Sequence, residues 1–206
     1  MSQIALPFDW PAPESAESFI VSDSNRDAVN QLDRPGSWPV LAAILTGPRK
    51  SGRSLLGRIF AVKTGGTLID DGELHREADI FHRWNLAQEA RKPLLIIALS
   101  PPPIWKIRLP DLASRLAATP LLTISEPDGV LAAMLLEKLL GQRGLAITAE
   151  TITYIINRTE RSYLVLMRVV DAIDEAALSQ RRAVTIPLAK MVLERLHMID
   201  VQRELL

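Results

Sequence analysis

The sequence predicts an α/β fold, in which a parallel β-sheet lies between layers of helices and is followed by an all-helical end. Short apolar runs recur between stretches whose apolar residues have helical spacing, the pattern of alternating strands and helices. The connections are short, and alternating units with short crossovers form parallel sheets. From Thr148 onward only helical patterns occur. We therefore expect about four strands and a lid of three helices.

The composition limits the classes of function. The chain has 206 residues, of which 48% are hydrophobic, enough for one sizeable core with a small appended domain. Lys plus Arg equals Asp plus Glu at 24 each, so no overall basic field exists to hold a polyanion such as DNA. The absence of cysteine excludes disulfides and thiolate chemistry and fits a reducing cytoplasm. With neither a secretory leader nor a membrane-spanning run in the sequence, we expect a cytoplasmic protein.

Residues 1–18 contain three prolines and indicate an extended leader. Within it, Gln3, Leu6 and Phe8 form a glutamine followed by two large apolar side chains, without a helix or strand period. Such a peptide is suited to docking, with Leu6 and Phe8 filling pockets and Gln3 forming an orienting hydrogen bond. The alternative is that the apolar side chains of the leader fold back and cover the core of the body.

The first helix and strand of the body follow the leader. The stretch Ser22–Asn25 consists of residue types that favour the N-cap position, and it predicts a helix from Arg26 to Leu32. The run from Pro39 to Thr46 is apolar on both faces, as parallel strands covered by helices are. It predicts the first buried strand.

The stretch Gly47–Ser54 has the glycine spacing of a phosphate loop, G-x-x-x-x-G-K-[ST]. Gly47 and Gly52 let the backbone wrap an anion at the N-terminus of the next helix, and Ser54 supplies the hydroxyl that would touch magnesium. Arg53 stands where the motif has lysine, and its planar fork binds phosphate with a different geometry. The alternative is a strand-to-helix turn without a ligand.

Two carboxylates end the next predicted strand, Thr67–Ile69. Asp70 and Asp71 stand where, in a fold with a phosphate loop, one acid holds magnesium and another orients water. The alternative is that they cap the helix that follows.

Two further strands are separated by a segment that carries an arginine near the end of a short helix. A helix from Glu77 to Ala90 precedes the strand Leu94–Leu99, which ends at Ser100 and three prolines. The stretch Leu109–Leu116 predicts a short helix with Arg115 near its C-terminal end, where a cation favours the negative end of the helix dipole. The fourth strand is Leu121–Ile124.

The remaining helices start at capping residues. Ser125 followed by Pro127 predicts the start of a helix that reaches Leu140. Three lid helices are then expected, over 148–157, 161–179 and from 185 to 197 or beyond. For the second of them we expect an apolar stripe that faces the lid core, formed by Leu164, Met167, Val170 and Ile173. We divide the chain into a leader (1–18), an α/β nucleotide-binding domain (19–145) and a helical lid (146–206).

The order of these parts resembles the AAA+ nucleotide-binding module, and more narrowly the bacterial replication initiator DnaA and its regulatory homologue Hda. The stretch Phe19–Asn25 is similar to the segment that flanks the adenine pocket in that family, and Gly47–Ser54 is similar to its Walker A loop. Ile69–Asp71 resembles its Walker B strand, and Leu109–Leu116 matches the helix that carries its arginine finger. The peptide Gln3–Phe8 resembles the sliding-clamp-binding peptide at the N-terminus of Hda.

The resemblance implies roles for individual residues. Arg115 would be an arginine finger that reaches ATP on a neighbouring subunit, and Asp71 would be the second catalytic residue. Ser54 and Asp70 would hold Mg²⁺. The implied nucleotide-binding residues, for ADP or ATP, are Gly47, Lys50, Gly52, Arg53, Ser54, Leu55, Ile20 and Val21.

Three departures from the family pattern concern the sheet and the nucleotide chemistry. The segment before Asp70 is too short for the usual strand and helix, so an outer strand of the sheet is expected to be missing. Ser100 stands about where the family has a polar sensor, and the second sensor arginine would fall near Leu164 or Val165, neither of which can contact a phosphate. Together with Arg53, these changes predict weak or absent ATP turnover by the chain itself.

These observations favour an Hda-like regulator that binds the DNA polymerase III sliding clamp (beta subunit) and promotes hydrolysis of DnaA-bound ATP, near the nucleoid and replisome. Such a regulator has no direct sequence-specific DNA binding and no membrane association, and a homodimer is compatible with the sequence. One alternative is an autonomous AAA+ ATPase or nucleotide switch. Another is a clamp-binding scaffold without nucleotide.

Overall fold

The computed structural model describes residues 19–180 and 183–196. Its centre is a parallel four-stranded sheet with the strand order β2-β3-β1-β4. The strands are β1 (Ala42–Thr46), β2 (Thr67–Ile69), β3 (Leu94–Ile97) and β4 (Leu121–Thr123). The expected parallel sheet of about four strands is therefore confirmed. All residues of β1 and β3 are buried, as the apolar character of both strand faces predicts.

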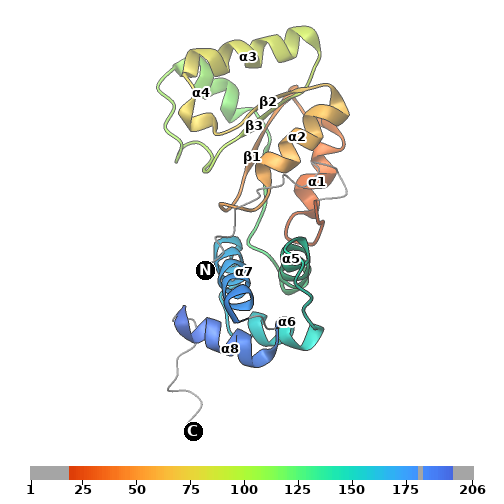
Figure 1. The fold of residues 1–206 in the computed structure, drawn as a ribbon. Coiled ribbons are helices and arrows are strands. Elements are labelled where there is room, and N and C mark those ends of the chain that lie inside the picture. Colours follow the sequence, from red (N-terminus) through yellow and green to blue (C-terminus); the bar gives the residue numbers. More distant parts are fainter. Residues whose placement is uncertain (1–18, 181–182, 197–206) are drawn as a thin grey trace, which may run out of the picture.

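Helices cover both faces of the sheet (Figure 1). On one face, α1 (Arg26–Leu32) and α2 (Arg53–Thr64) enclose a core that includes Leu45, Leu95 and Phe60. On the other face, α3 (Glu77–Ala90) and α4 (Pro110–Ala117) enclose a second core around Ile44, Ile96 and Trp84. Two short 3₁₀ helices, η2 (Pro35–Ser37) and η3 (Gly72–Leu74), lie in the connections.

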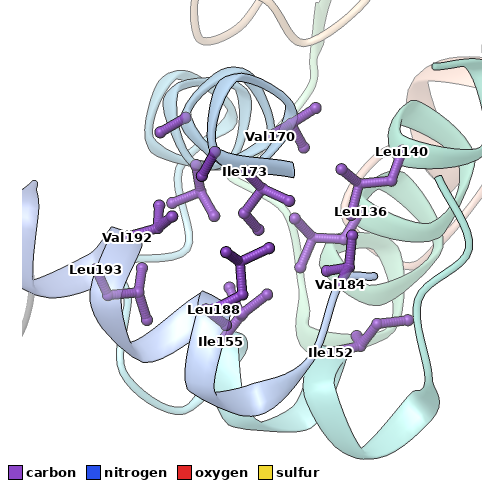
Figure 2. Packing of buried hydrophobic residues seen from close by; sticks show 14 of the residues in the cluster. Leu136, Leu140, Ile152, Ile155, Val170, Ile173, Val184, Leu188, Val192 and Leu193 are labelled. Atoms are coloured by element: carbon purple, nitrogen blue, oxygen red, sulfur yellow. The ribbon is translucent and has the colours of Figure 1, made fainter. Parts of the chain in front are cut away.

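The lid is a separate helical layer below the sheet in Figure 1. It contains α6 (Ala149–Ile156), α7 (Tyr163–Gln180) and α8 (Ile186–Arg195), together with α5 (Gly129–Gln142), which leads into it. Figure 2 shows its apolar core, in which side chains from all four helices meet. Three of the four buried residues that α5 contributes, Ala132, Leu136 and Leu140, belong to this core. This packing favours a lid that begins with α5, whereas the sequence division placed α5 in the α/β domain.

Two sequence expectations about the lid helices differ from the structure, the second of them only in part. Asp128, and not Ser125, caps α5, because its carboxylate accepts a hydrogen bond from the backbone N–H of Leu131 at 2.7 Å. In α7 the residues facing the core include Leu166, Val169 and Ile173, whereas Leu164 is 47% exposed. Of the expected stripe, Val170 and Ile173 are buried in the lid core, Met167 is half-buried and Leu164 is exposed, so the expectation is confirmed only in part. None of the helices in the described part of the chain is both long and apolar enough to cross a membrane.

Replacing Asp128 by Ala is expected to lower the free energy of unfolding by about 1 kcal/mol at neutral pH, a usual cost for losing an N-cap. The Leu131 N–H, followed by the Ser22 and Ser24 groups, lowers the pKa of Asp128 below its ordinary value. A lowered pKa in the folded state stabilises the fold above the unfolded pKa, and this contribution is lost as the pH falls through the folded value.

Urea unfolding of wild type and Asp128→Ala between neutral pH and about pH 3 measures this effect. The difference between the two proteins should shrink in the acid range. Glu137→Ala, at an exposed position of the same helix, is the control and should change stability by less than about 0.5 kcal/mol. A difference for Asp128→Ala that does not depend on pH contradicts the prediction.

Candidate functional site

The loop 47–54 joins β1 to α2 and is shaped to approach an anion closely. Gly52 precedes α2 with a φ of 85°, a left-handed conformation that glycine adopts without strain. At Gly47 a Cβ atom would lie 2.8 Å from the carbonyl oxygen of Ile124, so no larger residue fits. The hydroxyl of Ser51 is buried and has no hydrogen-bond partner among the described residues. An unpaired buried hydroxyl within such a loop fits a bound phosphate group.

A hollow of about 100 Å³ lies beside this loop and is formed by four separate parts of the chain. Asn25 shapes one wall, because its side-chain amide donates to the carbonyl of Ile20 at 2.9 Å and accepts from the N–H of Ser22 at 2.9 Å. The hydroxyl of Tyr163 donates to the carbonyl of Ser125 at 3.2 Å, and burial raises the pKa of Tyr163. The walls are mostly apolar, as a flat heterocyclic ring requires. The lining residues are Phe19, Ile20, Asn25, Lys50, Ser51, Gly52, Leu55, Leu131, Leu135 and Tyr163.

Several predicted nucleotide-binding residues lie here. Ile20, Lys50, Gly52 and Leu55 line this hollow. Val21 does not, since it is 48% exposed and lines a different hollow between α1 and α2. Its placement gives no support to a role for Val21 in contacting a base.

A larger hollow of about 620 Å³, which we call the phosphate hollow, lies between the loop 47–54 and the ends of β2 and β3. It brings Asp71 together with Lys50 and Arg53 of the phosphate loop, a motif that the sequence analysis treats separately from Asp71. The guanidinium of Arg53 donates to the carbonyl oxygen of Ala98 at the end of β3. The other lining residues are Arg49, Glu73, Leu74, Leu99, Ser100, Ile104, Trp105 and Leu164.

Ser54 and Asp70, the predicted magnesium ligands, are half-buried and are not among the residues that line the phosphate hollow. A carboxylate oxygen of Asp70 accepts from the N–H of Asp71 at 3.1 Å. Magnesium usually binds one or two carboxylates, with substrate phosphates and water completing its octahedron. Asp70 and Asp71 could supply those carboxylates. In the described ranges no three acidic or histidine side chains form a metal cluster on their own.

Arg115 lies in the last turn of α4 and is half-buried. Its guanidinium carbon is 4.7 Å from the ring centroid of Trp84 and 4.8 Å from that of Phe81, both on α3. These cation–π contacts hold the side chain at the α3–α4 surface without using its N–H groups. Within the described part of the chain, no acceptor is hydrogen-bonded to this guanidinium. Arg115 is thus oriented but still able to donate hydrogen bonds.

The end of α4 is tied to α3 by a further pair of bonds. The indole N–H of Trp84 donates to the hydroxyl of Thr119 at 3.2 Å, and that hydroxyl donates to the carbonyl of Arg115 at 2.8 Å. These bonds fix the backbone beneath the arginine. Gln3, Leu6 and Phe8, the predicted clamp-binding residues, lie outside the described residues.

The fold resembles the AAA+ domains of DnaA and RuvB. Domain III of the Thermotoga maritima replication initiation protein DnaA superposes with a TM-score of 0.71 at 14% identity, covering 88% of this chain and 96% of that one. AMPPCP-bound DnaA from Aquifex aeolicus gives a TM-score of 0.62 at 18% identity, over 84% and 70% of the two chains. The Thermotoga maritima RuvB Holliday junction branch migration motor gives 0.62 at 14% identity, over 89% and 72%.

The lid helices give a narrower similarity than the fold as a whole. Residues 132–193 match the family model described as the Hda lid domain. The lid is therefore Hda-like and the fold is similar to that of DnaA domain III, as the resemblance in the sequence motifs predicts. An uncharacterized protein of Haemophilus influenzae is 30% identical over 118 residues, which are 57% of this chain. This chain covers 51% of the length of that relative.

Proposed function

We propose that this chain is a regulator of replication initiation that binds the DNA polymerase III sliding clamp and accelerates hydrolysis of ATP bound to DnaA. Gln3, Leu6 and Phe8 would dock on the clamp, and Arg115 would reach the phosphates of the partner's nucleotide. The protein would act in the cytoplasm, at the replisome, and its effect would be to switch off the initiator.

The observation that carries this proposal is the state of Arg115. An arginine that acts in trans must be held at a surface while its donors stay free for another molecule. Arg115 meets both conditions, because two aromatic rings hold the guanidinium and no acceptor among the described residues binds it. A planar fork of donors neutralises the charge that develops on a transferred phosphoryl group.

The chain's own nucleotide site supports binding better than turnover. The phosphate loop has an unpaired buried hydroxyl at Ser51 and leads to a mostly apolar hollow of suitable character for a base. Arg53, however, is bonded to the carbonyl of Ala98, and the exposed Leu164 lines the phosphate hollow where an arginine would be needed. We therefore propose that ADP or ATP, with Mg²⁺, binds here mainly to stabilise the fold. The similar fold of Aquifex aeolicus DnaA is bound to AMPPCP.

The test is a single-turnover assay of DnaA loaded with radiolabelled ATP, with this chain, sliding clamp and DNA added in all combinations. We expect conversion to ADP to accelerate only when all components are present. Unchanged conversion in the complete mixture contradicts the proposal. Substantial ATP turnover by this chain alone, abolished by Asp71→Asn, would instead support an autonomous ATPase.

The clamp contact is tested separately by retention of the chain on immobilised clamp. Replacing Gln3 and Leu6 together by Ala should abolish retention, since an isolated docking peptide of this kind has roughly micromolar affinity and few contacts to lose. Retention of this double variant at the wild-type level excludes the leader as the docking element. Gel filtration of the same preparations reports whether the chain forms the homodimer that its sequence allows.

A further inference from the structure

The segment that joins the sheet to the arginine-bearing helix is tied to the protein at its beginning. We call residues 99–109 the connecting segment; it runs from the end of β3 to the start of α4. The carboxylate of Glu73, in η3, accepts hydrogen bonds from the N–H groups of Leu99 and Ser100, the second at 3.1 Å. Glu73 also lines the phosphate hollow beside Arg53. The first residues of the connecting segment are thus held by the carboxylate of Glu73, a residue that lines the phosphate hollow.

The same segment is tied at its other end by a second glutamate. Glu77, the first residue of α3, accepts from the N–H of Arg108 at 3.0 Å and from the N–H of Leu109 at 2.6 Å. Leu109 is the N-cap residue of α4, the helix that carries Arg115. These N–H groups lower the pKa of Glu77 below its ordinary value, so the carboxylate is ionised at neutral pH.

The middle of the connecting segment packs against Gly72, the residue immediately before Glu73. Trp105 is 8% exposed, and its ring is so close to Gly72 that a Cβ atom there would lie 3.0 Å from Cη2 of the indole. Trp105 also lines the phosphate hollow. The connecting segment therefore contacts the stretch 71–77 at three places, and two of these lie at the nucleotide site.

We propose that Glu73 and Glu77 are positioning residues that transmit the occupancy of the phosphate hollow to Arg115. A phosphate group bound by Arg49, Lys50 and Arg53 would lie in the hollow that Glu73 also lines, and its charge would repel the Glu73 carboxylate. Displacement of the Glu73 carboxylate weakens its hydrogen bonds to Leu99 and Ser100 and moves the connecting segment. Glu77 binds both Arg108, near the far end of that segment, and Leu109, the N-cap of α4, so α4 moves with the segment. The functional consequence, though not the movement itself, rests on the proposed role of Arg115.

Spin labels can measure the movement directly, because the chain has no cysteine of its own. Val62→Cys on α2 and Ala117→Cys on α4 are exposed labelling sites. With ADP and Mg²⁺ as the probe, pulsed EPR should show a changed distance between the labels in the unaltered chain. The change should persist in the control Glu89→Gln, an exposed glutamate of α3, and disappear in Glu73→Gln and Glu77→Gln while calorimetry still shows ADP binding.

The outcomes that overturn the coupling are specific. No ADP-dependent change in the unaltered chain overturns it, whether or not ADP binds. If ADP changes the label distance in Glu73→Gln as much as in Glu89→Gln, the assigned role of Glu73 is overturned. The same result for Glu77→Gln overturns the role of Glu77. Thermal unfolding midpoints of the variants show that each is folded under the conditions of measurement.

A kinetic experiment tests the consequence for the partner. Glu77→Gln should lower the maximal rate of stimulated ATP hydrolysis by roughly tenfold or more, because small displacements of an orienting group are costly, and leave the half-saturating concentration unchanged. In an Arg115→Ala background the same substitution should cause no further loss. A further loss, or an effect on half-saturation alone, overturns positioning. If Arg115→Ala itself has no effect, the proposed function fails while the EPR result stands.

Discussion

Arg115→Ala is expected to reduce the stimulated hydrolysis of DnaA-bound ATP by about a thousandfold, the lower end of the effect of arginines supplied in trans. The guanidinium lies over two rings of α3 and has no hydrogen-bond or ion-pair partner among the described residues, so its removal exposes some ring surface but leaves no buried charge unpaired. The variant should therefore stay folded and still bind the clamp. Single-turnover hydrolysis with clamp and DNA present is the measurement.

Two further variants separate the shape of the side chain from its charge. Arg115→Lys keeps the charge but loses the planar fork and most of the stacking, and we expect it to recover only a small part of the activity. Arg83→Ala removes an exposed arginine from α3 and is the matched control, expected to retain the full rate. Equal losses for Arg83→Ala and Arg115→Ala would show that general positive charge, and not a positioned arginine, is responsible.

Local signals predicted much of the fold. The bounds of α1, β2 and α3 agree with the sequence expectations because each element has unambiguous neighbours: a cluster of capping residues, a glycine pair or a continuous apolar face. The cap of α5 was missed because Ser125, Pro127 and Asp128 all favour a helix start. Asp128 also accepts from the N–H of Ser24, which lies 104 positions away in sequence, and no local pattern reports such a contact.

The candidate site also contains residues that local signals predicted and residues that they did not. Lys50, Arg53 and Asp71 were predicted from the phosphate-loop spacing and the family resemblance, and they line one hollow, although their roles stay predictions. Asn25 and Tyr163 were missed as site residues, since each looks like part of a helix start until the lid closes beside the phosphate loop. Glu73 and Glu77 were missed because they bind backbone N–H groups, which leave no trace in the sequence of their partners.

Leu136→Ala is expected to lower the free energy of unfolding by about 3 kcal/mol, within the usual range for removing a buried leucine side chain. Leu136 is 0% exposed and lies in the lid core (Figure 2), where α6 and α7 pack against its helix. Urea unfolding followed by far-UV circular dichroism measures the loss. Leu178→Ala, at a position that is 65% exposed, is the control and should change stability by less than about 0.5 kcal/mol.

The shape of the urea-unfolding curve of Leu136→Ala tests how the α/β domain and the lid are joined. Helix α5 places Leu131 in the core beneath α1 and α2 and Leu136 in the lid core, while Leu135 packs against both. A helix shared in this way should make the lid and the sheet unfold together, because melting α5 removes side chains from both cores. We therefore expect Leu136→Ala to shift a single transition with an unchanged slope. A separate early transition of the lid would show that α5 does not couple the two domains.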